Sequence, residues 1–391
     1  MTTRLPAFGI AAVILADLVL ASSVPTRSPR PGGALAPTGK MQVPRAVHTA
    51  TLLRDGHVLV AGGMQKNGVY EDTAELYDPT SGGFEKLPRL ATARVGHSAT
   101  LLPNGKVLLA GGSAGRRFEG GRWVGEVVSS AELYDPASRT FQPAGRMAQA
   151  RAHHAAALLG DGRVLVAGGY AGEDSHALAS AEIYDPISGA FRPVGSLRKA
   201  RVVDTSVLLS DSRVFIPGGT DASGSVLASG EIFDPKTNAF APAGAMIAAR
   251  HKHGGVLLAS GRVLVVGGSD ARDWSGQKTE AEIYDPASNL FAPAASMSLR
   301  RFKIGHAVSR LRDGRVLVAG GAAAPEVYDP MRGEFLPVSG GYGQPRYYAT
   351  ATLLADGRVL VAGGYGTGTV SEGPLSTTDA WLFAPASQTA D

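Results

Sequence analysis

The chain has 391 residues, of which 44% are hydrophobic and 18% charged, so it is long enough to bury a large core. Its formal net charge is only +4 and no block of basic residues stands out, which argues against a nucleic-acid partner. The sequence contains no cysteine, which excludes disulfides, thiolate zinc sites, iron–sulfur clusters and a cysteine nucleophile.

The N-terminal 23 residues predict export to the periplasm, the cell surface or the medium. Arg4 precedes an apolar run over 5–20, and small residues at 21–23 offer a site for signal peptidase. Asp17 interrupts the run, which is also long for a signal peptide, so an uncleaved membrane anchor is the alternative. Residues 24–34 are rich in Pro, Gly and Arg and predict a flexible linker.

From residue 35 onward the chain repeats one pattern. An apolar run that ends in paired glycines recurs roughly every fifty residues. The first glycines of the seven pairs are Gly62, Gly111, Gly168, Gly218, Gly267, Gly320 and Gly363. Seven copies at this period predict one repeat architecture rather than separate domains.

Each repeat predicts four short strands. The first, such as "HTATLL" at 48–53, is followed by a dipeptide such as Asp55-Gly56, which favours a tight hairpin. The second, "VLVAGG", is apolar on both sides and belongs inside a stack of sheets. A variable loop leads to a third strand, such as "AELYDP" at 74–79, and an Asp-Pro turn leads to a fourth, marked by Phe84. Four strands per unit are typical of a propeller blade.

The two ends of the repeat region complement each other. The seventh repeat ends before a fourth strand, whereas "LAPTGKMQVPR" at 35–45 matches the pattern of "FQPAGRMAQAR" at 141–151. We therefore expect the N-terminal segment to supply the outer strand of the last blade, so that 35–391 forms one closed ring.

The hydrophobic run before Gly-Gly, the tyrosine of "ELYDP" or "EIYDP" and the later aromatic resemble the Kelch repeat, with Phe where many Kelch units have Trp. The resemblance covers 35 to about 385 and implies an all-β, seven-bladed Kelch-type propeller with four antiparallel strands per blade, as in exported bacterial Kelch-repeat proteins. Similar propellers include binding scaffolds, sugar-handling enzymes and copper-radical oxidases, so the fold alone does not define the function.

One basic residue stands seventeen positions before each first glycine, and in six repeats one glutamate stands two positions before the third-strand aromatic. The expected topology brings both to one face, where we interpret them as structural ion pairs. The alternative is a ring that attracts a carboxylate or sulfated ligand. The positions are Arg45, Arg94, Arg151, Arg201, Arg250, Lys303 and Arg346, with Glu75, Glu132, Glu182, Glu231, Glu282 and Glu326.

Histidines recur fourteen positions before the first glycines, as at His48 and His97, and we interpret them as packing residues. His251 and His253 lie on one face of a predicted strand, which is a spacing that could ligate a metal. No third ligand is identified for them, so we expect no metal site.

Candidate ligand-binding residues lie where the repeat departs from its own pattern. Trp381 replaces the seventh glutamate, which leaves Arg346 without its expected partner, and Asp204 replaces a recurring histidine. Two loops after Gly-Gly place Trp beside Arg, which favours stacking on a sugar or contact with a protein. Alternatively, each Trp anchors its own loop. The candidates are Arg116, Arg117, Arg122, Trp123, Arg272, Trp274, Arg346, Tyr347 and Tyr348.

These patterns favour a non-enzymatic, monomeric binding propeller for a protein or glycan ligand, with no catalytic residues, no cofactor and no membrane contact beyond a possible N-terminal anchor. The alternative is a carbohydrate-active propeller enzyme. A mutarotase-like reaction needs little more than a cation for a carboxylate and an acid–base group. A galactose-oxidase-like relative would lack the Tyr–Cys cofactor, because the chain has no cysteine.

Overall fold

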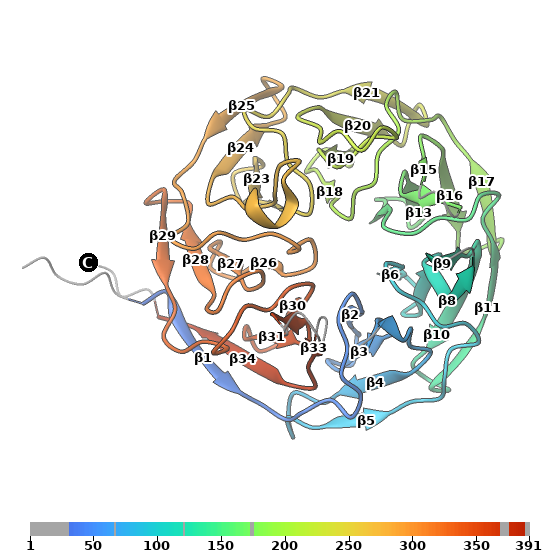
Figure 1. Ribbon diagram of the computed structural model, residues 1–391, viewed down its shortest axis with the longest axis horizontal. Helices are drawn as coiled ribbons and strands as arrows, with labels where there is room; N and C mark the ends of the chain where they lie inside the picture. The colour runs from blue at the N-terminus through green and yellow to red at the C-terminus, as the bar shows by residue number, and fades with distance from the viewer. Residues whose placement is uncertain (1–30, 66–67, 120–121, 173–175, 368–374, 388–391) are drawn as a thin grey trace, which may run out of the picture.

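The computed structural model describes residues 31–65, 68–119, 122–172, 176–367 and 375–387, and the side chains of 116–125 lie outside this description. Seven four-stranded antiparallel sheets surround one axis (Figure 1). The predicted all-β, seven-bladed propeller is therefore confirmed. The expected signal peptide or anchor at 1–23, and most of the linker at 24–34, lie outside the described residues.

The first four blades run from the inner to the outer strand in chain order. Their strands are β2 (Thr49–Leu52), β3 (Val58–Ala61), β4 (Ala74–Tyr77) and β5 (Phe84–Lys86); β6 (Ser98–Leu101), β7 (Val107–Ala110), β10 (Ser130–Asp135) and β11 (Thr140–Arg146); β12 (Ala155–Leu158), β13 (Val164–Ala167), β16 (Ala181–Asp185) and β17 (Ala190–Pro193); β18 (Val207–Leu208), β19 (Val214–Pro217), β20 (Gly230–Asp234) and β21 (Ala239–Pro242).

Blades five and six repeat this order, and blade seven takes its outer strand from the N-terminus. Their strands are β22 (Gly254–Leu257), β23 (Val263–Val266), β24 (Ala281–Asp285) and β25 (Leu290–Pro293); β26 (Val308–Arg310), β27 (Val316–Val318), β28 (Glu326–Asp329) and β29 (Glu334–Pro337); β30 (Thr350–Leu353), β31 (Val359–Ala362), β34 (Ala380–Pro385) and β1 (Gly33–Pro37).

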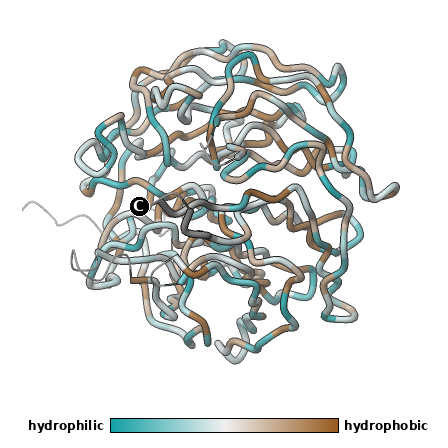
Figure 2. Tube along the Cα trace, turned by 45° about the vertical axis from the view of Figure 1, so that its right-hand side comes forward, coloured by the Kyte–Doolittle hydropathy of each residue, from teal (hydrophilic) through white to brown (hydrophobic). Residues whose placement is uncertain are grey.

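The second strand of every blade is buried on both faces, as its unbroken apolar sequence predicts. The core lies between neighbouring blades, because seven apolar clusters each take side chains from two of them. In one such cluster, Leu59 of blade one packs with Val107 and Tyr134 of blade two. Figure 2 shows the hydropathy along the chain, with many hydrophilic segments at the turns. Packing between blades therefore stabilises the ring as a unit.

The N-terminal strand closes the ring. β1 begins at Gly33 and pairs antiparallel with β34, with Leu35 opposite Phe383. On its other edge the Leu35 amide donates to the Ser339 carbonyl, 2.8 Å away, in the connection between blades six and seven. β1 therefore holds two blades together, as the match between 35–45 and 141–151 predicts.

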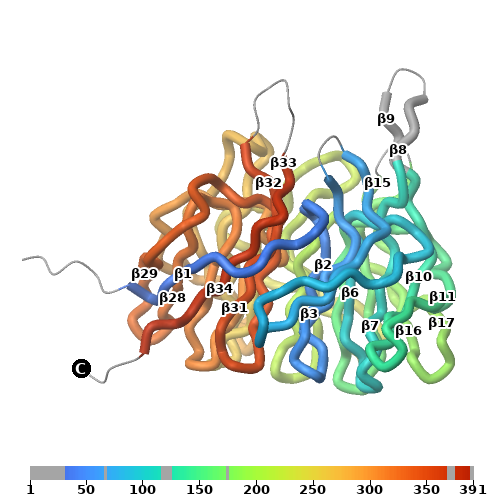
Figure 3. Tube along the Cα trace, turned by 90° about the horizontal axis from the view of Figure 1, so that it is seen from below, coloured from blue at the N-terminus to red at the C-terminus, as the bar shows by residue number. Residues whose placement is uncertain are grey.

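Three hairpins rise from one face of the ring, which we call the loop face. They are β8 (Ser113–Glu119) with β9 (Arg122–Val127), β14 (Tyr170–Ala171) with β15 (His176–Ala177), and β32 (Tyr365–Gly366) with β33 (Leu375–Ser376) (Figure 3). In blade five, the 3₁₀ turn η2 (Asp273–Ser275) lies in the equivalent loop. None of the helices among the described residues is long and apolar enough to span a membrane.

Candidate functional site

The repeated arginines and glutamates form ion pairs inside each of the first six blades. In blade one, Arg45 Nη2 lies 2.7 Å from Glu75 Oε1, and Nη1 donates to the Gly62 carbonyl at 2.7 Å. Glu75 also accepts the amide of Gln42, in the segment arriving from the preceding blade. The same contacts recur with N–O distances of 2.5 to 3.1 Å in the pairs Arg94–Glu132, Arg151–Glu182, Arg201–Glu231, Arg250–Glu282 and Arg301–Glu326. These charges neutralise one another within the fold and offer no basic ring to a ligand.

The sixth arginine of this series is Arg301, which corrects the assignment of Lys303. Arg301 Nη1 donates to the Gly320 carbonyl at 2.8 Å across nineteen positions instead of seventeen. The two additional residues are Gly305 and His306, which stand just before the first strand of blade six. Because the spacing is longer there, counting back by the usual interval selects the wrong cation.

Blade seven replaces the Arg–Glu pair by stacking on Trp381 and a longer contact with Asp379. The Arg346 guanidinium lies 5.2 Å from the centre of the Trp381 ring, and Nη2 lies 3.6 Å from Asp379. Arg346 and Tyr347 are buried, at 4% exposure each, and not exposed on the loop face as candidates for ligand contact would be. Their role in ligand binding stays a prediction.

The recurring histidines link neighbouring blades. Their Nε2 atoms lie within hydrogen-bond distance of a hydroxyl on the preceding blade: His48 with Thr350, His97 with Thr49, and His154 with Ser98, at 2.9 to 3.2 Å. Burial lowers the pKa of all three, that of His154 to about 3. They are neutral packing residues at physiological pH.

The residues that stand two positions after each repeated arginine surround the axis, and backbone hydrogen bonds join several of them. The amides of Val203, Lys303 and Tyr348 donate to the carbonyls of the equivalent residues in the preceding blades, at 2.7 to 3.1 Å. We call the seven positions the axial ring: Val47, Gly96, His153, Val203, Lys252, Lys303 and Tyr348. Six of the seven have a backbone φ between +49° and +62°. This left-handed conformation is unfavourable for residues other than glycine, and such backbone strain is typical of functional sites.

The axial ring and the adjoining loops form an aromatic and basic site on the loop face. We call it the face cluster: Lys252, Lys303, Asp273, Trp274, Phe302, Tyr347, Tyr348 and Tyr365. Lys303 Nζ lies 2.6 Å from the Tyr365 hydroxyl and 3.9 Å from the centre of the Trp274 ring. Trp274 packs edge-on against Phe302 and Tyr347, at centroid distances of 4.9 and 5.0 Å, yet remains 47% exposed. It thus anchors its loop and also offers a surface to a ligand.

Acidic residues pair with most cations beside this cluster. Lys252 Nζ lies 2.6 Å from Asp273 Oδ1, and His251 Nε2 lies 3.5 Å from the same oxygen. Arg272, a sequence candidate, is exposed and pairs with Asp270 at 2.7 Å. Burial, followed by the charge of Lys252, lowers the pKa of Lys303 to about 8.

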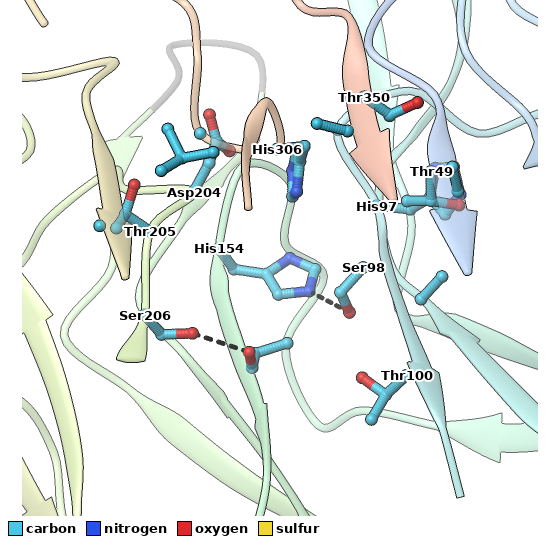
Figure 4. A pocket seen from close by; sticks show the side chains of 18 residues that line it. Thr49, His97, Ser98, Thr100, His154, Asp204, Thr205, Ser206, His306 and Thr350 are labelled. Carbon is cyan, nitrogen blue, oxygen red and sulfur yellow. Dashed lines mark hydrogen bonds between the residues drawn. The ribbon is translucent and has the colours of Figure 1, made fainter. Parts of the chain in front are cut away.

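A polar cavity of about 300 Å³ lies inside the channel, lined by the first strands (Figure 4). Asp204 lies there, with Oδ1 2.8 Å from Nδ1 of His153 in the axial ring. This contact, together with the His153 charge, holds the pKa of Asp204 at about 2 against the effect of burial, and Asp204 raises the pKa of His153. His306 is exposed within the channel and points toward the same space. Two departures from the repeat, Asp204 and the extra Gly305-His306, therefore meet in one place.

Sequence reasoning placed Trp274, Tyr347 and Tyr348 in the face cluster but missed Lys252, Asp273, Phe302 and Tyr365, as well as His153 beside the channel. Lys252 and His153 share one signal, the positive-φ position two residues after a repeated arginine, but the side chains at that position share no chemical type. The other tryptophan candidate, Trp123, and the arginines with it, Arg116, Arg117 and Arg122, have side chains outside the described residues. Their binding role stays a prediction.

The donor groups of the described residues do not form a metal centre. Within the described residues, no group of three or more His, Asp or Glu side chains is arranged to hold a metal ion. His251 contacts Asp273, whereas His253 is buried against the glycine pairs, because the positive φ of Lys252 breaks the alternation between them.

A family model for the Kelch motif matches residues 151–198, which span blade three. The fold is similar to a solved structure described as a novel fungal alcohol oxidase with catalytic diversity among the AA5 family, in complex with copper. The TM-score is 0.69 with 19% identity, over 90% of this chain and 76% of that one, which shows a shared fold. No curated protein matches the sequence.

Proposed function

We propose that this Kelch-motif propeller is an exported, monomeric binding protein that recognises a glycan at the face cluster. The observation that carries the proposal is Trp274, which is half exposed on a loop face where most other large aromatic side chains are buried. A rigid indole beside tyrosine hydroxyls and a lysine is a combination suited to stacking on a sugar ring. The axial ring fixes this site, because its members are bonded through the backbone to neighbouring blades.

Replacing Trp274 by Ala tests this function. We expect the wild-type protein, beginning after residue 23, to bind a subset of glycans on a defined array, and Trp274→Ala to weaken that binding about tenfold or more, as loss of a central aromatic contact does. Ile187 is 97% exposed in the Asp-Pro turn of blade three, away from the loop face, so Ile187→Ala is the matched control. Equal binding by the wild-type protein and Trp274→Ala would refute the proposal.

The channel favours a second candidate, a mutarotase-like isomerisation of a reducing sugar. Asp204 and His306 line the same cavity as two acid–base groups, and Asp204 also contacts His153 of the axial ring. Ring opening of a cyclic hemiacetal needs one group to remove the anomeric hydroxyl proton and another to protonate the ring oxygen, with no cofactor.

Exchange of sugar anomers, followed by NMR, separates this candidate from simple binding. If the channel is catalytic, the wild-type protein accelerates exchange, and Asp204→Asn lowers the acceleration about a hundredfold or more, the effect typical of a lost acid–base group. If the anomers exchange no faster with the wild-type protein than in buffer, the mutarotase-like candidate is refuted and only the binding function remains.

A further inference from the structure

Lys303 is a buried cation without an acidic partner. Nine Lys and Arg residues are buried in the described part of the chain, and eight of them have a carboxylate oxygen within 4.0 Å. Lys303, at 7% exposure, is the exception; its polar contact among these residues is the Tyr365 hydroxyl. Its Nζ also lies 3.9 to 5.9 Å from the ring centres of Trp274, Phe302, Tyr347, Tyr348 and Tyr365, which offsets part of the cost of burial. Unlike the other eight cations, however, it has no carboxylate to neutralise it.

The surrounding charges do not compensate it. Lys252 is paired with Asp273, and His153 is paired with Asp204. The pKa of His251 is lowered to about 4 by burial, so this side chain is neutral at physiological pH. Burial raises the pKa values of Tyr347, Tyr348 and Tyr365, so these hydroxyls also remain neutral. The face cluster therefore carries one net positive charge.

The hydrogen-bond geometry leaves donors for an anion. The ammonium of Lys303 donates to the Tyr365 oxygen, so the hydroxyl hydrogen of Tyr365 is free to donate in turn. A lysine ammonium has three donors, and this contact uses one of them. An oxoanion beside Lys303 and Tyr365 would receive charge-assisted hydrogen bonds in a poorly solvated site, where such bonds are strong.

We propose that the face cluster recognises an acidic oligosaccharide, whose carboxylate or sulfate ester binds Lys303 and the Tyr365 hydroxyl while an adjoining sugar unit packs on the face of Trp274 that Lys303 leaves free. This inference rests on the proposed glycan-binding function and names the class of its ligand. Lys303 acts as a point charge, which accepts either oxoanion.

Isothermal titration calorimetry with three oligosaccharides tests the assignment. The probes are an oligogalacturonate, a sulfated galacto-oligosaccharide and the neutral galacto-oligosaccharide. At pH 7 we expect at least one acidic probe to bind more tightly than the neutral one, and Lys303→Met to weaken that binding about ten- to hundredfold, the range for a charged hydrogen bond. Lys236 is exposed in the Asp-Pro turn of blade four, so Lys236→Met is the matched control and should bind as the wild type does.

The pH dependence and the stability of Lys303→Met add independent readouts. An anion binds the protonated amine, so affinity should be constant below pH 8 and fall by up to about tenfold per pH unit above it. Lys303→Met should melt within a few degrees of the wild type, because it removes a buried charge without a carboxylate partner but also the contacts of that charge with Tyr365 and Trp274. A melting temperature in that range shows that lost binding is not caused by misfolding.

The outcomes separate this inference from the function on which it rests. If the neutral probe binds as tightly as the acidic ones through Trp274, the binding function stands and the acidic ligand is refuted. The acidic ligand is also refuted if Lys303→Met binds the acidic probes as tightly as the wild-type protein does. If the array and all three probes show no binding, both proposals fail.

Discussion

Replacing Arg94 by Ala should lower the free energy of unfolding by about 3–5 kcal/mol, the range for breaking a buried ion pair. The substitution leaves Glu132 buried without its cation and removes the donors to the Gly111 and Ser130 carbonyls, 2.7 and 2.9 Å away. Chemical denaturation followed by circular dichroism measures the loss.

An exposed ion pair in the preceding blade provides the control. Arg89 lies 2.6 Å from Asp72, but the arginine side chain is 70% exposed. Arg89→Ala should therefore cost about 1 kcal/mol or less. Equal costs for Arg94→Ala and Arg89→Ala would contradict a structural role for the repeated pairs.

Removing the N-terminal strand should lower the free energy of unfolding at least as much as Arg94→Ala does. A chain that begins at Thr38 lacks β1, so β34 becomes an exposed edge and the contacts of Leu35 with Phe383 and Trp381 are lost. We expect a loss of about 5 kcal/mol or more relative to a chain that begins at Pro31, at about 1 kcal/mol per backbone hydrogen bond and about 2 for the leucine. We also expect aggregation through the unpaired edge.

A synthetic peptide covering 31–40 should restore part of the melting temperature of the shortened chain. Such rescue would show that the missing pairing, rather than a folding defect, causes the loss. Equal stability of the two chains without peptide would contradict closure of the ring by β1.

The sequence predicted the ring because its signals are local and repeated. Paired glycines at a regular interval define the number of blades, and the match of 35–45 with 141–151 predicts the closure. The same regularity led to the wrong assignment of Lys303 to the arginine series, because counting back by a fixed interval does not detect the two additional residues, Gly305 and His306. The insertion is visible only once Arg301 is seen beside Glu326.

The face cluster was largely beyond sequence reasoning. Its lysines and aromatic residues are distant in the chain, and they meet because the axial ring places one residue from every blade around the axis. A position that holds Val in blade one, Gly in blade two and Lys in blade five shows no pattern in side-chain chemistry. The pairing of Lys252 with Asp273, which leaves Lys303 uncompensated, depends on distances that a sequence does not contain.

The claim that the face cluster holds one uncompensated buried cation is tested most directly by titrating the lysines with NMR. The chain has nine lysines, so a sample labelled with ¹³C-lysine gives few signals, and Lys303→Met assigns the relevant one. We predict that Lys303 titrates at a pKa of about 8, whereas exposed lysines titrate near their usual value of about 10.4. A pKa of Lys303 at or above that usual value would show that the charge is already neutralised or solvated, and would contradict the anion site.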